Sequence, residues 1–226
     1  TNGGGGGRLG GRIQIWDSAE ADRCVYKKPG LRKPRVEEDY TPEYFGLFKW
    51  VADMEIDPTP CELYVVESLK NSVKVYSIKG EKPELVREFG SDVFDFPRAI
   101  EKGAGENFYV VDGNNHRVVI VNGIGEVQGE FGGFGSGDGK FIYPWDVAYD
   151  DSTGYVFVSD PLNRRIHIFD SEGKHLASWT QMPPQRGRPA IRGQQPDFSN
   201  AGSYALECDG NGNLFVGHGS EIMRLR

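Results

Sequence analysis

The sequence has no long apolar run, no helical periodicity and no paired-cysteine motif. No stretch approaches the roughly 18–20 apolar residues of a membrane-spanning helix, so a helical membrane span is excluded. Apolar residues do not recur at helical spacing for more than about one turn, which argues against a helical domain. The three cysteines are widely spaced. We therefore expect reduced thiols in an intracellular protein, and neither a disulfide framework nor a zinc site.

Recognisable catalytic and metal-binding motifs are also missing. The chain has four histidines, and none occurs in an HxH, HxxxH or HExxH pattern. It has no GxSxG elbow, no phosphate-binding P-loop and no dinucleotide-binding glycine motif before a helix. We therefore predict no catalytic residue, no bound metal and no cofactor.

Glycine and short apolar segments are what the chain has in quantity. It contains 31 glycines, and 38% of its 226 residues are hydrophobic, which is enough for one large all-β domain. One pattern of an apolar strand, an acid, a polar loop and a second apolar strand recurs as YVVESLKNSVKVY at 64–76, YVVDGNNHRVVIV at 109–121 and FVSDPLNRRIHIF at 157–169. Short strands that repeat every ~45 residues predict a β-propeller.

Each repeat unit is predicted to contain four antiparallel strands. Within residues 141–179 we expect strands at 144–149, 154–160, 164–170 and 175–179, joined by turn sequences such as DDSTG and SEGK. Residues 96–131 follow the same plan. A sheet with two apolar faces must be covered on both of them, and stacking neighbouring sheets around an axis achieves this.

The motifs resemble those of NHL-repeat proteins. The segments that carry the resemblance are DGNNHRV at 112–118 and FGGFGSGDGKFIYP at 131–144, together with a Pro-x-x-[Val/Ile]-Ala opening of the first strand. The resemblance covers about residues 45–226 and a further partial unit at 1–26. It implies an all-β, NHL-type β-propeller with four-stranded antiparallel blades, of which this chain carries part of a six-bladed ring.

The expected propeller domain consists of blades and interblade loops. We expect a partial blade with third and fourth strands at 1–26, a charged interblade loop at 27–44, complete blades at 45–90, 91–132 and 133–180, a loop rich in proline, arginine and glycine at 181–198, and a partial blade at 199–226. A partial ring exposes sheet faces and edges, which need cover from further residues or from a partner chain.

Two charged pairs recur at equivalent places in successive units. They are Asp112 with Arg117 and Asp160 with Arg165. An active site needs its set of residues only once, so the repetition favours a structural role. We expect each pair to tie the loop between the second and third strands to the sheet.

The chain also resembles a family of enzymes, but only in the way that one blade is built. Residues 144–179 resemble a blade of peptidyl-α-hydroxyglycine amidating lyases, which hold zinc through histidines in the propeller channel and use a catalytic Tyr and Arg. This chain has Pro161-Leu162 in place of the Tyr, and residues 202–205 read Gly-Ser-Tyr-Ala in place of Pro-His-Ser-Leu. A metal-dependent lyase-like or hydrolase-like enzyme, with a metal gathered by His116 and His218, is therefore an alternative and not the leading interpretation.

Basic residues gather on the face formed by the loops between second and third strands and by the interblade loops. The net charge of −7 hides this distribution. The expected binding residues on this face are Lys70, Arg98, Asn114, Asn115, Tyr143, Trp145 and Arg164, together with Lys27, Lys28, Arg32, Lys33, Arg186, Arg188 and Arg192 in two long loops. Such loops can order on a protein partner, contact RNA phosphates or remain solvated.

The leading interpretation is a non-catalytic propeller that acts as a protein–protein interaction scaffold within a larger protein or assembly. The runner-up is RNA binding, as in the NHL domains of tripartite-motif proteins that the chain resembles. In that case Trp145 would stack on a base and Arg98 would supply positive charge. Acidic residues in the same region, among them Asp92, Asp95 and Asp146, weigh against RNA.

Overall fold

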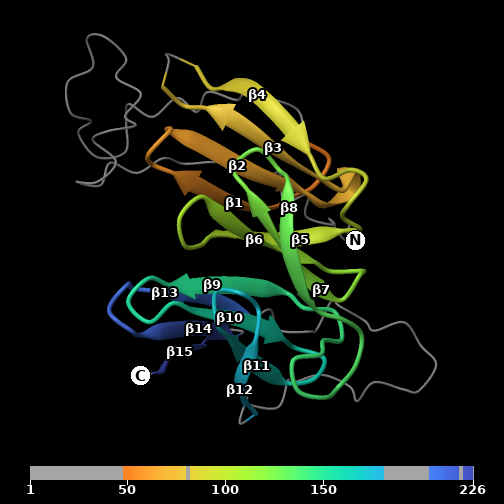
Figure 1. Ribbon diagram of the computed structural model, residues 1–226, viewed down its shortest axis with the longest axis vertical. Coiled ribbons are helices and arrows are strands. Elements are labelled where there is room, and N and C mark those ends of the chain that lie inside the picture. The colour runs from red at the N-terminus through yellow and green to blue at the C-terminus, as the bar shows by residue number, and fades with distance from the viewer. Residues whose placement is uncertain (1–47, 80–81, 181–203, 219–220, 226) are drawn as a thin grey trace, which may run out of the picture.

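The protein is built from small antiparallel sheets arranged side by side (Figure 1). The computed structural model describes residues 48–79, 82–180, 204–218 and 221–225. No helix in this part of the chain is long and apolar enough to span a bilayer. The strands are β1 (Val51–Asp57), β2 (Glu62–Glu67), β3 (Ser72–Ser77), β4 (Glu84–Phe89), β5 (Pro97–Lys102), β6 (Asn107–Asp112), β7 (Arg117–Asn122), β8 (Val127–Gly132), β9 (Asp146–Asp150), β10 (Tyr155–Asp160), β11 (Arg165–Phe169), β12 (His175–Trp179), β13 (Tyr204–Cys208), β14 (Leu214–His218) and β15 (Glu221–Leu225).

Four sheets form the blades of the propeller. Strands β1–β4, β5–β8 and β9–β12 make three four-stranded sheets in chain order, and β13–β15 make a three-stranded sheet. The first strands β1, β5, β9 and β13 contact one another in succession, so they line a common axis. This arrangement confirms the predicted all-β propeller. Closure as a six-bladed ring stays a prediction.

Apolar side chains fill the space between neighbouring blades. Successive side chains of a strand point to opposite faces of its sheet, and both faces of an inner blade are apolar. The layers are formed by Tyr64, Val66, Val73, Val75, Phe108, Val110, Val119 and Val121 between the first two blades, by Tyr109, Val111, Val118, Phe131, Val156, Val158 and Phe169 between the next two, and by Ala148, Ile166, Leu206, Leu214 and Val216 before the last. Each fully buried side chain of this kind contributes about 1.5–3 kcal/mol, so the hydrophobic effect dominates blade association.

The turn between the third and fourth strands of a blade rests on the previous blade. Gly125 and Gly173 have φ angles of 89° and 87°. A Cβ atom at Gly125 would lie 2.3 Å from Phe89, and one at Gly173 would lie 2.4 Å from Phe131. Both positions need glycine for the backbone conformation and for the close approach to the ring. The two contacts therefore hold neighbouring blades in a fixed relative position.

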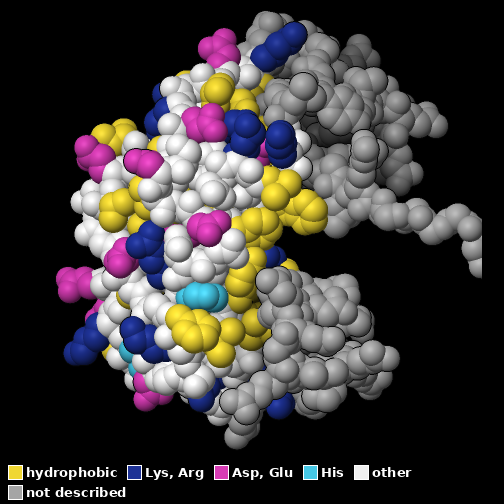
Figure 2. Space-filling view, turned by 90° about the vertical axis from the view of Figure 1, so that its right-hand side faces the viewer, with side chains coloured by type: hydrophobic (Ala, Val, Ile, Leu, Met, Phe, Trp, Pro, Cys, Tyr) yellow, Lys and Arg dark blue, Asp and Glu magenta, His cyan; other side chains and the backbone are white. Residues whose placement is uncertain are grey.

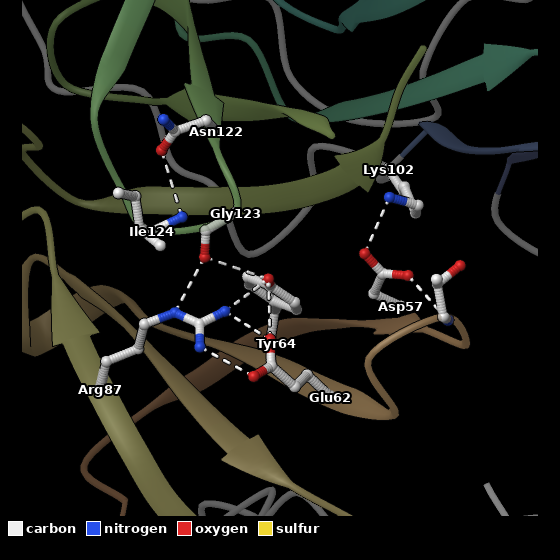
Figure 3. A network of polar contacts seen from close by, with 9 residues as sticks. Asp57, Glu62, Tyr64, Arg87, Lys102, Asn122, Gly123 and Ile124 are labelled. Carbon is white, nitrogen blue, oxygen red and sulfur yellow. Dashed lines mark hydrogen bonds and ion pairs between the residues drawn. The ribbon is translucent and has the colours of Figure 1, made fainter. Parts of the chain in front are cut away.

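Polar contacts also join the first two blades (Figure 3). Arg87 on β4 pairs with Glu62 on β2 and donates from Nε to the carbonyl of Gly123 in the next blade at 2.8 Å. Lys102 on β5 pairs with Asp57 on β1, with 2.9 Å between Nζ and Oδ2. These charge-assisted bonds are directional, so they add geometric specificity to the apolar contacts.

The cysteines depart from the sequence-based expectation. Cys61 is disulfide-bonded, whereas Cys208 is free. Cys24 lies outside the described residues. The expectation of reduced thiols was therefore wrong for Cys61, because an odd number of widely spaced cysteines leaves room for one bridge.

Candidate functional site

One hydrogen-bond arrangement is used in three successive blades at the face that we call the loop face, which is formed by the β2–β3, β6–β7 and β10–β11 loops and by the linkers into β1, β5 and β9. A buried acid ends the second strand of each blade, at Glu67, Asp112 and Asp160. Its side chain accepts a hydrogen bond from a backbone N–H of the linker that enters the same blade, at Lys49 (2.6 Å), Asp95 (2.7 Å) and Ile142 (3.0 Å). The repeated acid therefore fixes the path of the linker.

The next residue along each of these linkers is aromatic, at Trp50, Phe96 and Tyr143. Phe96 and Tyr143 have φ angles of 55° and 63°, in the left-handed region that residues other than glycine rarely adopt. The N–H of Phe96 donates to Asn71 Oδ1 at 2.9 Å, and that of Tyr143 donates to His116 Nδ1 at 3.0 Å. Both acceptors belong to the preceding blade. Strained backbone held by specific hydrogen bonds is common at functional sites.

Phe96, Arg98, Tyr143 and Trp145 form one compact group, which we call the rim cluster. Arg98 is the extra residue of a β-bulge near the start of β5. Its Cζ atom lies 3.3 Å from the centroid of the Trp145 ring, 5.5 Å from that of Tyr143 and 5.8 Å from that of Phe96. The guanidinium group is therefore stacked on an indole and bordered by two further rings, in a cation–π arrangement.

The surroundings of Arg98 hold it in place and leave one donor unused. A Cβ atom at Gly113 would lie 3.1 Å from the aliphatic stem of Arg98, so glycine at this position makes room for the stem. Burial lowers the pKa of Arg98, whereas a hydrogen bond with Tyr143 and the charge of Asp146 act in the opposite direction. The Nε–H group is buried and has no hydrogen-bond partner among the described residues.

Aromatic surface continues from the rim cluster across the loop face. The His116 ring centroid lies 6.4 Å from that of Tyr143 and 5.0 Å from that of Phe134. Phe134 is 71% exposed, and Trp50 is 57% exposed. Figure 2 shows hydrophobic side chains in a band on one side of the molecule, with a histidine against the band. Contiguous exposed apolar surface of this kind marks interaction sites.

The other predicted binding residues lie around the rim cluster without forming part of it. Asn114 donates to Asp95 at 3.0 Å, which ties the β6–β7 loop to the linker into β5, and Asn115 donates to the buried Asp112 at 2.9 Å. Lys70 and Arg164 are exposed in the β2–β3 and β10–β11 loops. The remaining predicted binding residues lie outside the described residues, namely Lys27, Lys28, Arg32, Lys33, Arg186, Arg188 and Arg192.

The repeated acid–arginine pairs differ between blades. Arg117 Nε donates to Asp112 at 2.9 Å, as an ion pair. The expected pair of Asp160 with Arg165 does not form, because Arg165 donates instead to the carbonyl of Ser136 at 2.8 Å. The glycine-rich linker before β9 brings this carbonyl within reach of the guanidinium group.

Carboxyl side chains line the axis below the loop face, which sequence reasoning missed. Asp53, Glu55, Glu101, Asp146 and Glu207 border a cavity of about 250 Å³ between the first strands of the blades. Three of them accept a backbone N–H from the next blade, Asp53 from Ile100 at 2.9 Å, Glu101 from Tyr149 at 3.1 Å and Asp146 from Leu206 at 2.8 Å. The carboxyl groups thus link successive blades along the axis.

Burial makes these axial carboxyl groups weak acids. Loss of hydration raises the pKa of Asp53 to about 6, of Asp146 to about 7, of Glu55 to about 8 and of Glu101 to about 9. Neighbouring carboxylates add to the effect, because like charges disfavour ionisation. Among the described residues no group of three or more His, Cys, Asp or Glu side chains has an arrangement that could hold a metal ion.

Comparisons with known proteins support the propeller class. No family model matches the chain. The chain is 27% identical over 161 residues to NHL repeat-containing protein 3 of Mus musculus, a match that covers 70% of this chain and 44% of that protein. It is 32% identical over 108 residues to peptidyl-glycine alpha-amidating monooxygenase of Mus musculus, which covers 45% of this chain and 11% of that protein. Virginiamycin B lyase from Staphylococcus aureus superimposes with a TM-score of 0.54 and 14% identity, covering 78% of this chain and 55% of that one.

These similarities confirm the resemblance to NHL-repeat β-propellers. The chain spans less than half the length of both curated relatives, 44% of one and 11% of the other. Their names therefore describe proteins that extend well beyond the matched part. The likeness to the bacterial lyase, at 14% identity, shows the fold alone.

Sequence reasoning found three of the four rim-cluster residues, Arg98, Tyr143 and Trp145. It missed Phe96, and it missed the equivalent exposed position of Trp50. An alignment of the three linkers would have shown an aromatic residue at the same place in three successive units, namely Trp50, Phe96 and Tyr143. The signal was present in the repeat, but it lies outside the strands on which the repeat was recognised.

Proposed function

We propose that this propeller is a non-catalytic protein-binding scaffold whose contact site is the rim cluster. The proposal is carried by one observation, the Arg98 guanidinium group stacked on Trp145 among half-buried aromatic side chains, from which a row of rings leads to the exposed Phe134. Arginine, tyrosine and tryptophan supply most of the binding energy at protein interfaces, from patches with partly buried anchors. The rim cluster has this composition.

The blades supply a rigid support for such a site. Phe96 and Tyr143 are held by hydrogen bonds to the preceding blade, and the residue before each of them is held by an acid of their own blade. Side chains that are already ordered lose little conformational entropy when a partner binds. The proposal includes that this scaffold acts within a larger protein or assembly, and the match to 44% of the length of its mouse relative supports that part.

A comparative pull-down tests the proposal. Wild-type protein, Arg98→Leu and Trp145→Ala are used as baits in nuclease-treated extract, and bound proteins are quantified by mass spectrometry. Lys174→Ala is the control, since Lys174 is exposed in a turn of the opposite face. We expect both rim-cluster variants to lose the same partners that the control retains. Equal recovery on all four baits would mean that the rim cluster is not the contact site.

RNA binding remains the second candidate, favoured by the same Arg98–Trp145 stack, because single-stranded bases also stack on aromatic side chains. Two features weigh against it. Asp92 and Asp95 are exposed in the linker beside the rim cluster, and Asp146 acts on Arg98 from below. The same pull-down is repeated in untreated extract, and partners found there but absent after nuclease treatment would favour RNA.

An enzymatic function is the third candidate, suggested by the similarity to amidating monooxygenase and virginiamycin B lyase. The absence of a lyase-type Tyr and His at 161–162 and 202–205 argues against it. We expect no turnover of a peptidyl-α-hydroxyglycine substrate with added zinc. Turnover that is lost on chelation and restored by zinc would establish an enzyme.

The proposed compartment depends on the cysteines. An intracellular location was expected from the sequence and stays a prediction. The disulfide at Cys61 favours an oxidising environment instead, because disulfides persist mainly in secreted and lumenal proteins. A count of reactive thiols with and without reductant distinguishes the two states.

A further inference from the structure

We infer that the rim cluster recognises a carboxylate-bearing peptide segment, an Asp or Glu side chain flanked by apolar residues. This inference rests on the proposed protein-binding function and specifies its partner. The carboxylate would meet the edge of the Arg98 guanidinium group, and the apolar neighbours would cover the aromatic surface that extends to Phe134.

The geometry of Arg98 points to a planar anion. One face of the guanidinium group is covered by the Trp145 ring, at 3.3 Å from its centroid. Stacking uses the face of the group and leaves its N–H donors in the plane of the guanidinium group, where Tyr143 engages only part of them. A carboxylate matches this fork with two parallel hydrogen bonds, which is the preferred recognition geometry of arginine. Among the described residues the buried Nε–H is not satisfied, so the bonding capacity of Arg98 is not exhausted.

The surface next to Arg98 points to apolar flanking residues. Tyr143, His116 and Phe134 follow one another in contact, with ring centroids 6.4 and 5.0 Å apart. Phe134 at the far end is 71% exposed. Aromatic side chains bury a large apolar area on contact and are rarely left uncovered in such a row. This row of rings begins beside the Arg98 guanidinium group. A partner that covers the rings and the guanidinium group must therefore carry its negative charge next to apolar groups.

The charges around the rim cluster favour a single carboxylate over a polyanion. Asp95 is exposed and directly precedes Phe96, and Asp92 is exposed in the same linker. Asp146 follows Trp145 and acts electrostatically on Arg98. A phosphate backbone would meet the exposed Asp92 and Asp95 repeatedly, whereas one Asp or Glu can meet Arg98 alone. Repulsion by the nearby carboxylates therefore selects against a polyanionic partner.

A peptide selection followed by a double-mutant cycle tests the inference. A phage-displayed library of random 12-residue peptides is panned on the wild-type chain. The best peptide is then synthesised with blocked termini, in an acidic form and in a form with Glu→Gln or Asp→Asn. Fluorescence anisotropy measures the Kd of each form for wild type and for Arg98→Met, which keeps the stem that packs over Gly113. Arg98→Lys, which keeps the charge but loses the fork, covers the case in which Arg98→Met does not fold. Lys174→Met is the matched control.

We expect peptides with an acid beside aliphatic or aromatic residues. The acidic form should bind wild type and Lys174→Met at least tenfold more tightly than the amide form, and this ratio should fall to about one in Arg98→Met. Arg98→Lys should lose most of it. Binding without preference for the acid would overturn the inference and leave the protein-binding function intact. Failure to select any peptide would contradict both. Displacement of the peptide by a 20-residue oligouridylate, itself dependent on Arg98, would assign the site to phosphate instead.

Discussion

Replacement of Glu101 by glutamine should stabilise the protein at alkaline pH. Glu101 lies on β5 at the axial cavity, and its Oε1 atom accepts the backbone N–H of Tyr149 at 3.1 Å. Burial and the neighbouring Glu55 raise its pKa from 4.5 to about 9. The carboxylate form is therefore disfavoured in the folded protein but not in the unfolded chain. Glutamine keeps the acceptor oxygen and removes the charge.

The sign and size of the effect follow from proton linkage. Below pH 4.5 the group is protonated in both states and costs nothing. As the pH rises towards about 9, only the unfolded chain releases the proton freely, so the free energy of unfolding falls with pH. At about 1.4 kcal/mol per pKa unit, the loss reaches roughly 4–5 kcal/mol at pH 8. The new amide N–H₂ group needs a partner, at a cost of about 1–2 kcal/mol. We therefore expect Glu101→Gln to be more stable than wild type by roughly 2–4 kcal/mol at pH 8.

Urea denaturation at a series of pH values measures this difference. Near pH 4.5 the carboxyl group costs wild type little, so Glu101→Gln should be less stable than wild type by about 1–2 kcal/mol. The two curves should cross at about pH 5–6, and the variant should then gain on wild type steadily as the pH rises further. The control is Glu84→Gln, an exposed position on β4, which should follow wild type throughout. The reasoning fails if the two curves stay parallel, or if the stability of the wild type increases between pH 5 and pH 9.

Three further predictions concern the repeat and the cysteines. Asp112→Ala should lower the free energy of unfolding by about 2–3 kcal/mol in urea, because the linker N–H of Asp95 loses its acceptor and Arg117 loses one partner, although Glu130 and the Val93 carbonyl still bind Arg117; a loss below about 1 kcal/mol would contradict the structural role. Gly173→Ala should cost more than about 3 kcal/mol, because its Cβ would meet Phe131, whereas Gly105→Ala, with nothing within 4 Å, should cost only about 1 kcal/mol of backbone strain; equal thermal shifts would refute this. Thiol titration in urea should detect one reactive thiol without reductant, that of Cys208, and three thiols after reduction. In the native protein the Cys208 thiol should be unreactive, since burial raises its pKa to about 12. Three thiols without reductant would exclude the disulfide.

The sequence predicted the blades because each strand alternates on a period of two and each loop carries turn residues. These signals are local, so they are visible without a structure. Which residues of different blades lie close together is not a local property of the sequence. Asp53 and Asp146 occupy equivalent places on β1 and β9, and each follows its linker aromatic residue, Trp50 or Tyr143, by three positions. The spacing therefore aligns these two carboxyl groups, but it does not show that the first strands of different blades meet around one cavity.

Charged partners were predictable only where the residue types were kept. Asp112 and Arg117 lie together, as the spacing suggested. In the first blade the acid is Glu67, and its cation is Lys74, two residues further along β3 than the position equivalent to Arg117, at 2.6 Å. Glutamate is longer than aspartate, and Lys74 lies at another position of the repeat than Arg117. The Glu67–Lys74 pair nevertheless links the second and third strands as the Asp112–Arg117 pair does. Sequence comparison of equivalent positions cannot detect such an exchange, because it compares residues and not the atoms that meet.

The backbone hydrogen bonds of the loop face separate support from recognition. The three linkers are held through N–H groups at Lys49, Asp95 and Ile142, which every amino acid except proline can provide. The side chains that follow, Trp50, Phe96 and Tyr143, take no part in those bonds. Their identities can therefore be exchanged while the framework stays intact, except for proline and for the β-branched residues that the left-handed φ of Phe96 and Tyr143 disfavours. A propeller built in this way presents one exchangeable side chain on each of these three linkers. Three substitutions can therefore change what the loop face binds without a change of the fold.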